Sequence, residues 1–175
     1  MPWTFGGLFF ALRNALTRLS CLVLHGDFKK VDADEKIEAL KSVAVSRDFR
    51  TGHPELVKRF LTLADSYKRM FPTRDLIVTC VYRSPDEQGR LFKQGRFGNP
   101  GNIVTNCDGR TKKSQHNYFP SRALDVAVSD GGKIVWDEAH YYPLGVLAKE
   151  CGLEWGGWWD GFKDIPHFQL PKSVA

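Results

Sequence analysis

Four residues in two parts of the chain could together bind a metal ion and activate a water molecule. His116 and Asp125 lie in one stretch, and His167 lies in a later one. Two histidines and one carboxylate form a three-ligand zinc set that leaves the fourth position of a tetrahedral ion open for water, as in catalytic sites. Asp164 lies three residues before His167, where its carboxylate could take the proton of that water. The pattern indicates metal-assisted hydrolysis.

The local sequence also allows simpler interpretations. Asp125 lies in the apolar run 123–128, where a buried charge is costly unless it is paired or bound to a metal. Pro166 keeps the residue before it out of the helical region, so the segment around Asp164 is short and extended. Alternatively, Asp125 faces solvent at a strand end and the histidines are ordinary loop and edge residues. Spacing alone favours neither interpretation for His116 and Asp125, and favours the simpler one for the later pair.

Length and composition indicate one soluble domain. The 175 residues are 42% apolar and 26% charged, with a formal net charge of +5. The positive charge would favour a polyanion such as an acidic cell-wall polymer or anionic lipid, but the basic residues are scattered, which argues against a nucleic-acid partner. The four cysteines form no Cys-x-x-Cys motif. We expect reduced thiols, with the disulfide state left open.

Residues 1–30 form a separate amphipathic segment in this interpretation, ahead of a domain over 31–175. Leucines recur at helical spacing between Leu8 and Leu22, with polar residues on the other face. The segment is too interrupted to span a membrane and lacks a basic start, so it is a poor secretory signal. We favour a helix packed on the domain. The alternative is an interfacial helix, formed by residues 1–25, that contacts an anionic membrane surface.

The remaining chain reads as an irregular alternation of helices and strands with one hairpin, which favours an α+β fold. A Gly- and Asn-rich loop over 96–113 is long enough to be functional. The expected helices cover 31–45, 55–71, 84–94 and 139–151, and the expected strands cover 76–82, 123–128, 133–136 and 167–170.

Several spaced motifs together resemble the zinc D-Ala-D-Ala metallopeptidase family, over about Leu56 to Leu170. The motifs are Val81-Tyr82-Arg83-Ser84-Pro85-x-x-Gln88, Ser114-x-His116, Ala123-x-Asp125, Trp155-Gly156-Gly157 and Asp164-x-x-His167-Phe168. The family includes D,D-carboxypeptidases, D,D-dipeptidases and phage L-alanyl-D-glutamate endolysins. The resemblance implies a small α+β domain of the hedgehog/D-Ala-D-Ala-peptidase type, with an antiparallel sheet, flanking helices and a zinc cleft.

The resemblance also implies roles for particular residues. One Zn²⁺ per chain would be held by the three ligands named above, with Asp164 as general base and Arg83 stabilising charge on the substrate carbonyl. Ser114, Gln88 and Trp158 are expected to contact the substrate; without the resemblance, each reads as an ordinary loop, helix or core residue.

Two departures from the family pattern concern substrate choice. Eight residues separate His116 from Asp125, where the family usually has six, and Ser121 stands where a glycine would align. The added Phe119-Pro120 is expected to lengthen the loop before the strand and alter the cleft. Aspartate rather than glutamate in the base position points to the endolysin-like branch.

The resulting prediction is a monomeric peptidase that cleaves peptidoglycan stem peptides, of the phage L-alanyl-D-glutamate endolysin type. It would be made in the bacterial host cytoplasm and act in the periplasm or cell wall. The alternatives are a bacterial D-alanyl-D-alanine carboxypeptidase and a non-catalytic peptidoglycan-binding module that keeps the fold.

Overall fold

The computed structural model describes residues 38–174. The chain divides into two units, Met1–Ala39 and Leu40–Ala175, and the description below concerns the second. The predicted amphipathic segment, its membrane contact, Cys21 and the domain boundary near residue 30 all lie outside the described residues. Of the helix predicted over 31–45, residues 38–45 are described: residues 38–42 are helical, but the helix ends there and Val45 already belongs to a strand, so the predicted end was wrong. Among the described residues, no helix is long and apolar enough to cross a membrane.

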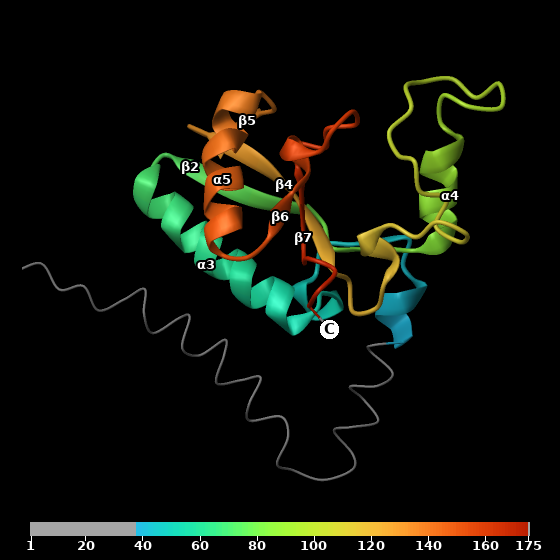
Figure 1. The fold of residues 1–175 in the computed structure, drawn as a ribbon, viewed down its shortest axis with the longest axis horizontal. Coiled ribbons are helices and arrows are strands. Elements are labelled where there is room, and N and C mark those ends of the chain that lie inside the picture. The colour runs from blue at the N-terminus through green and yellow to red at the C-terminus, as the bar shows by residue number, and fades with distance from the viewer. Residues whose placement is uncertain (1–37, 175) are drawn as a thin grey trace, which may run out of the picture. The chain divides into compact units, whose positions relative to one another are not determined.

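An antiparallel sheet of five strands forms the centre of the domain (Figure 1). Its strand order is β2 (Arg74–Cys80), β4 (Ala123–Asp130), β7 (His167–Gln169) and β6 (Glu154–Trp155), and β5 (Lys133–Val135) also pairs with β4. A separate pair joins β1 (Val45–Ser46) to β3 (Tyr82–Arg83). The predicted α+β class with an antiparallel sheet is confirmed.

Side chains of β4 alternate between the two faces of the sheet, and this alternation separates the core from the site. Leu124, Val126 and Val128 join the apolar core, so Asp125 projects from the opposite face. The core is completed by residues of α3 (Pro54–Met70) and α5 (Glu138–Glu150), among them Leu63, and these two helices contact each other. The carboxylate of Asp125 is therefore held on a strand whose other face packs against the core.

Helix α4 (Pro85–Lys93) begins where the sequence predicts it and directly precedes the long loop. The Ser84 hydroxyl accepts a hydrogen bond from the Glu87 amide at 3.2 Å, which caps the helix. In Figure 1, α4 and the loop that follows it extend away from α3 and α5. Residues 96–113 contain no helix or strand, as expected for the long loop.

The strand predicted over 76–82 is interrupted. A register irregularity lies between Val78 and Cys80, β2 ends at Cys80, and the chain resumes as β3, which pairs with β1 instead. The break between β2 and β3 matters for function because the Val81 carbonyl and the Arg83 side chain both lie beside the predicted metal ligands.

Candidate metal centre

Three donor atoms meet in a nearly equilateral triangle. His116 Nε2 lies 3.0 Å from Asp125 Oδ1 and 3.1 Å from His167 Nδ1. His167 Nδ1 lies 3.0 Å from Asp125 Oδ1. Ligand atoms bound at 2.0–2.2 Å to one tetrahedral zinc would lie ~3.3–3.6 Å apart. The observed edges are only a few tenths of an ångström shorter, so the fold brings the three predicted ligands together at the spacing that a metal ion requires.

Hydrogen bonds on the far side of each imidazole point the ring lone pairs at this triangle. His116 Nδ1 lies 2.7 Å from the Val81 carbonyl oxygen, which can only accept, so Nδ1 carries the proton. His167 Nε2 lies 3.0 Å from Gln169 Oε1. In the neutral tautomers, His116 Nε2 and His167 Nδ1 are therefore both electron-pair donors. Two lone pairs and a carboxylate oxygen directed at one point fit a cation.

A chain of hydrogen bonds fixes the orientation of His167. The Gln169 amide nitrogen donates to Glu154 Oε2 at 2.7 Å, which turns the amide oxygen toward the imidazole. Antiparallel pairing places Glu154 opposite Gln169 in strands β6 and β7. An outer carboxylate that orients a ligand histidine is a recurrent device in metal sites. Sequence analysis missed Gln169 and Glu154 because β6 is only two residues long and its partner is set by the fold.

The ligands are positioned by backbone elements rather than by one flexible loop. Asp125 and His167 are paired across β4 and β7. His116 lies in a short 3-10 helix, η3 (Gln115–Asn117), in which the Ser114 hydroxyl accepts from the His116 amide. Asn117 holds this turn from both sides, since its side chain accepts from the Ser114 amide at 2.8 Å and donates to the Arg83 carbonyl at 2.9 Å.

The connection between His116 and Asp125, which is longer than in the family pattern, also contacts the backbone carbonyl that faces His116. Ser121, which stands at the family's glycine position, is fully buried. Its hydroxyl donates to the Val81 carbonyl at 2.7 Å, the acceptor that also faces His116. Ala123 then pairs with Gln169, so the longer connection leaves the strand that carries Asp125 in register. The peptide bond between Phe119 and Pro120 is cis.

Arg83 binds the second oxygen of the carboxylate. Arg83 Nη2 lies 3.2 Å from Asp125 Oδ2, and Nη1 lies 3.1 Å from Gln88 Oε1. Gln88 is completely buried and its amide also donates to Thr105 and to the Cys107 carbonyl. Gln88 therefore contacts protein groups and supports Arg83, and its contact with the substrate stays a prediction.

Asp164 lines the same pocket as the two ligand histidines, His116 and His167. Burial raises the pKa of its carboxyl, with the Asp125 charge acting in the same direction and His167 opposing it. An acid held near the triangle with a raised pKa has the properties of a general base. Its backbone is fixed by the Trp-Gly-Gly motif: Trp155 Nε1 donates to the Ile165 carbonyl at 2.7 Å, and a Cβ on Gly156 would lie 2.4 Å from the Asp164 carbonyl oxygen.

The charges of the ligand pair depend on each other. Burial opposes protonation of His116, but the Asp125 carboxylate overcomes it and raises the pKa of His116 to about 10. Burial likewise opposes ionisation of Asp125, yet His116 and His167 hold its pKa well below the usual range. In the metal-free protein, a proton would thus take the place of a cation in the triangle.

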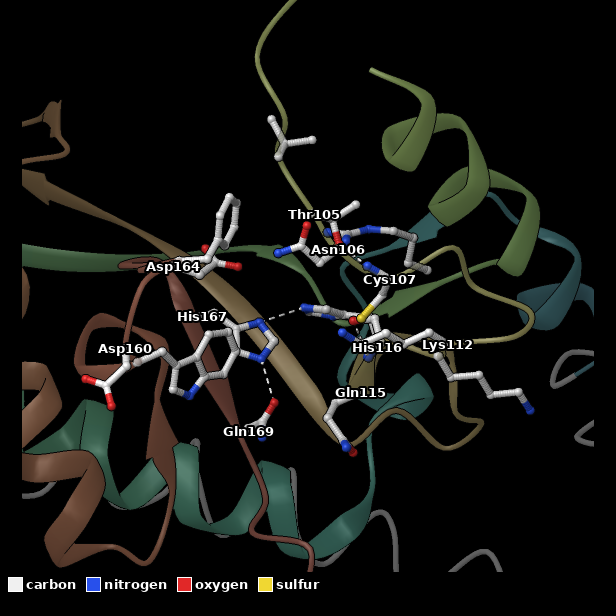
Figure 2. A pocket seen from close by; sticks show the side chains of 16 residues that line it. Thr105, Asn106, Cys107, Lys112, Gln115, His116, Asp160, Asp164, His167 and Gln169 are labelled. Carbon is white, nitrogen blue, oxygen red and sulfur yellow. Dashed lines mark hydrogen bonds between the residues drawn. The ribbon is translucent and has the colours of Figure 1, made fainter. Parts of the chain in front are cut away.

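The ligand triangle opens into a pocket of about 400 Å³ (Figure 2). Its lining includes Arg83 and Asp164, the predicted catalytic residues, and Ser114, which is predicted to contact the substrate. Trp159 lines the pocket and lies 5.0 Å from the His167 ring between centroids. Trp158, for which a substrate contact is predicted, is absent from the lining and packs on Trp155 at 5.4 Å instead. The turn of the short helix η4 (Gly156–Trp158) decides which tryptophan faces the pocket, and sequence spacing does not show this.

Cys80 offers a further donor near the triangle. Its Sγ, together with one atom each of His116 and Asp125, falls within a 4.8 Å group. The buried sulfur lies 3.5 Å from His116 Nδ1, the nitrogen that faces the Val81 carbonyl. To share a metal with Cys80, His116 would have to bind the ion through Nδ1 rather than through Nε2, so we favour His167 as the third ligand. The three described cysteines, Cys80, Cys107 and Cys151, are free thiols.

Comparisons with known proteins agree with this site. A family model described as D-alanyl-D-alanine carboxypeptidase matches residues 108–170. The chain is 39% identical over 106 residues to the peptidoglycan L-alanyl-D-glutamate endopeptidase CwlK of Bacillus subtilis, a match that covers 55% of this chain and 60% of that protein. The chain thus spans less than two thirds of that relative's length.

A solved structure extends the agreement to about three quarters of the chain. The crystal structure of the Serratia marcescens L-Ala D-Glu endopeptidase ChiX matches with a TM-score of 0.52 and 29% sequence identity. The match covers 74% of this chain and 88% of that one. The resemblance predicted from the motifs is confirmed, and the residues matched by the family model, 108–170, include Asp125, Asp164 and both histidines of the triangle.

Proposed function

We propose that this protein is a zinc-dependent peptidase that hydrolyses the L-alanyl-D-glutamyl bond of peptidoglycan stem peptides. The observation that carries the proposal is the convergence of His116 Nε2, Asp125 Oδ1 and His167 Nδ1 within 3.1 Å of one another beside the carboxyl of Asp164. The choice of bond rests on the activity of the two relatives, both named as L-alanyl-D-glutamate endopeptidases.

The chemistry would divide between the metal and the protein. Bound zinc supplies Lewis acidity toward the scissile carbonyl and lowers the pKa of water to ~7. Asp164 takes a proton from the attacking water and then delivers it to the leaving amine. Its raised pKa suits both steps, because a carboxylate that holds a proton more tightly is a stronger base and can still return the proton.

Arg83 would contribute in two ways. Its Nη2 bond to Asp125 Oδ2 leaves Oδ1 as the oxygen directed at the triangle. A guanidinium has five N–H donors, so Arg83, which also lines the pocket, keeps donors for a substrate carbonyl oxygen that gains charge. Ser114 would contact the bound peptide from the pocket rim.

Other parts of the prediction remain proposals. We propose that the protein acts on the cell wall or in the periplasm as a monomer, and that it belongs to the endolysin-like branch on account of Asp164. Contact of residues 1–25 with an anionic membrane is a proposal of the same kind.

The test is mass spectrometry of purified peptidoglycan after digestion by zinc-loaded wild type and by Asp164→Ala. We expect fragments with new amino-terminal D-glutamate from the wild type alone. Release of terminal D-alanine would instead identify a D,D-carboxypeptidase. If neither protein yields products while one zinc is bound, the chain is a non-catalytic module.

A further inference from the structure

The two walls of the pocket carry opposite charges. Asp160 and Asp164 line one side, and Lys112 and Lys113 line the loop side. Figure 2 shows Asp160 and Asp164 across the pocket from Lys112. A ligand carboxylate that entered this pocket would be repelled by the first wall and attracted to the second.

The two lysines are not occupied by ion pairs within the described part of the chain. Both side chains are exposed, and no carboxylate of residues 38–174 lies within ion-pair distance of either ammonium group. Lys113 Nζ lies 5.7 Å from the centre of the Tyr118 ring, and Lys112 extends outward from the rim in Figure 2. Arg83, the other cation of the lining, is already bound to Asp125.

The backbone that carries the lysines is fixed, although their side chains are free. Asp108 Oδ1 accepts from the amides of Arg110 and Lys112 at 2.7 and 2.9 Å, and the Gly109 amide donates to the Lys112 carbonyl at 3.1 Å. Gly109 has a φ of +83°, and a Cβ there would lie 2.6 Å from the Pro85 carbonyl oxygen. The turn is therefore closed and seated against α4.

The lysines are also within reach of the reacting bond. Lys113 precedes His116 by three residues, a backbone distance of at most ~11 Å, and a lysine carries its ammonium on a flexible four-carbon stem. Both lysines line the pocket that holds His116 and His167, so rotation about these flexible stems would bring an ammonium group toward a substrate residue beside the cleaved bond.

The substrate chemistry supplies the matching anion. A glutamyl residue joined to the peptide through one carboxyl keeps its other carboxyl free, next to the bond cut in the proposed function. We propose that Lys112 and Lys113 bind this free carboxylate and make the enzyme selective for stem peptides whose D-glutamate is not amidated. The inference rests on the proposed function and names the group that fixes its substrate class.

The experiment compares two synthetic peptides, L-Ala-γ-D-Glu-L-Lys and its D-isoglutamine counterpart, which differ by a carboxylate and a carboxamide. Each is tested with the zinc-loaded full chain, with the double variant Lys112→Met/Lys113→Met and with Lys112→Arg/Lys113→Arg. Lys133→Met, on the exposed strand β5, is the matched control. Cleavage gives kcat/KM, and calorimetry with the same peptides gives affinity independently of turnover.

We expect the wild type to prefer the carboxylate peptide, and the methionine variant to lose roughly tenfold in kcat/KM toward it while the carboxamide peptide is unaffected. The arginine variant should keep the preference, and added salt should weaken it. An equal preference in wild type and methionine variant would overturn the inference and leave the proposed function standing. If nothing is cleaved but the wild type alone binds the carboxylate peptide more tightly, the proposed function fails and the lysine site stands.

Discussion

At the scale of single residues, Asp164 is held where its charge is unfavourable. Burial raises the pKa of its carboxyl, so the folded protein binds this proton more tightly than the unfolded chain does. Ionised Asp164 therefore lowers stability above its folded pKa, and the cost disappears as pH falls toward the ordinary aspartate value. A residue that is selected for proton transfer rather than for stability would show this behaviour.

We therefore expect Asp164→Asn to abolish hydrolysis yet stabilise the metal-free protein at neutral pH. The gain in Tm should shrink as pH falls toward the ordinary aspartate value, because wild-type Asp164 then becomes neutral as well. Thermal unfolding of chelator-treated protein at a series of pH values measures this. Asp160→Asn, an exposed position on the same pocket wall, is the control and should change Tm little. A destabilised Asp164→Asn at pH 7 would contradict the argument.

Metal binding should release protons from the ligand pair. The Asp125 charge raises the pKa of His116 to about 10, so His116 is protonated in metal-free protein at neutral pH, and its Nε2 must lose that proton to bind zinc. We expect about one proton per zinc at pH 7, and tighter binding as pH rises toward 10. Calorimetry in buffers with different ionisation enthalpies counts the protons. A binding enthalpy that does not depend on the buffer would contradict the assignment.

The hydrogen-bond chain behind His167 should tune zinc affinity. Gln169→Ala removes the acceptor that keeps the proton on Nε2, so we expect about a 10- to 100-fold loss in zinc affinity. Glu154→Gln, which keeps an acceptor for the Gln169 amide, should have a smaller effect. Competition with a chromogenic chelator gives the affinities. Gln115→Ala is the matched control, since Gln115 lines the pocket but bonds to Arg122; an equal loss there would indicate a general disturbance.

At the scale of elements, Trp155 connects α5 to the segment that carries Asp164. Its ring is so close to Gly145 of α5 that a Cβ there would lie 2.1 Å from it. The indole also bonds to the Ile165 carbonyl. Because Gly145 has no side chain, the Trp155 ring packs directly against α5. This contact therefore determines the positions of Trp155 and of the segment that carries Asp164.

Gly145→Ala should destabilise the domain by about 1–3 kcal/mol through overpacking. Because the displaced ring holds Ile165, hydrolysis should fall more than stability alone explains. Gly89→Ala in α4 is the control, since its new Cβ would make only an ordinary contact at 3.4 Å and alanine favours a helix. Urea unfolding compares the two. A Gly145→Ala protein as stable as the wild type would contradict this packing argument.

At the scale of the whole molecule, local sequence patterns predicted most helices and strands but not which strands pair with one another. The apolar spacing of 55–71 predicted α3 closely, and the Ser84 cap followed by a proline predicted the start of α4. Both predictions succeeded because helices depend on nearby residues. Two-residue strand β6 and the split of 76–82 into β2 and β3 depend on pairing with distant strands, which spacing does not encode. The ligand set was recognisable from its motifs, whereas the orientation of Trp159 and the burial of Gln88 depend on tertiary packing.

The proposed metal ligands belong to three different structural elements, so zinc should stabilise the whole domain. His116 lies in η3, Asp125 in β4 and His167 in β7, and unfolding separates all of them. Binding that is confined to the folded state adds about 4 kcal/mol at a free zinc concentration 1,000 times Kd. We expect Tm to rise with zinc and to fall again with chelator, as calorimetry would show.

The variant His116→Ala provides the sharp comparison, because it removes one corner of the triangle while Asp125 and His167 remain paired across β4 and β7. Its Tm should respond little to zinc. Cys80→Ser tests the other donor set: if Cys80 shared the metal, this variant would lose the zinc-dependent rise as well. Since the sulfur faces His116 Nδ1 rather than the triangle, we expect Cys80→Ser to keep most of that rise, and its loss would move the metal from His167 to Cys80.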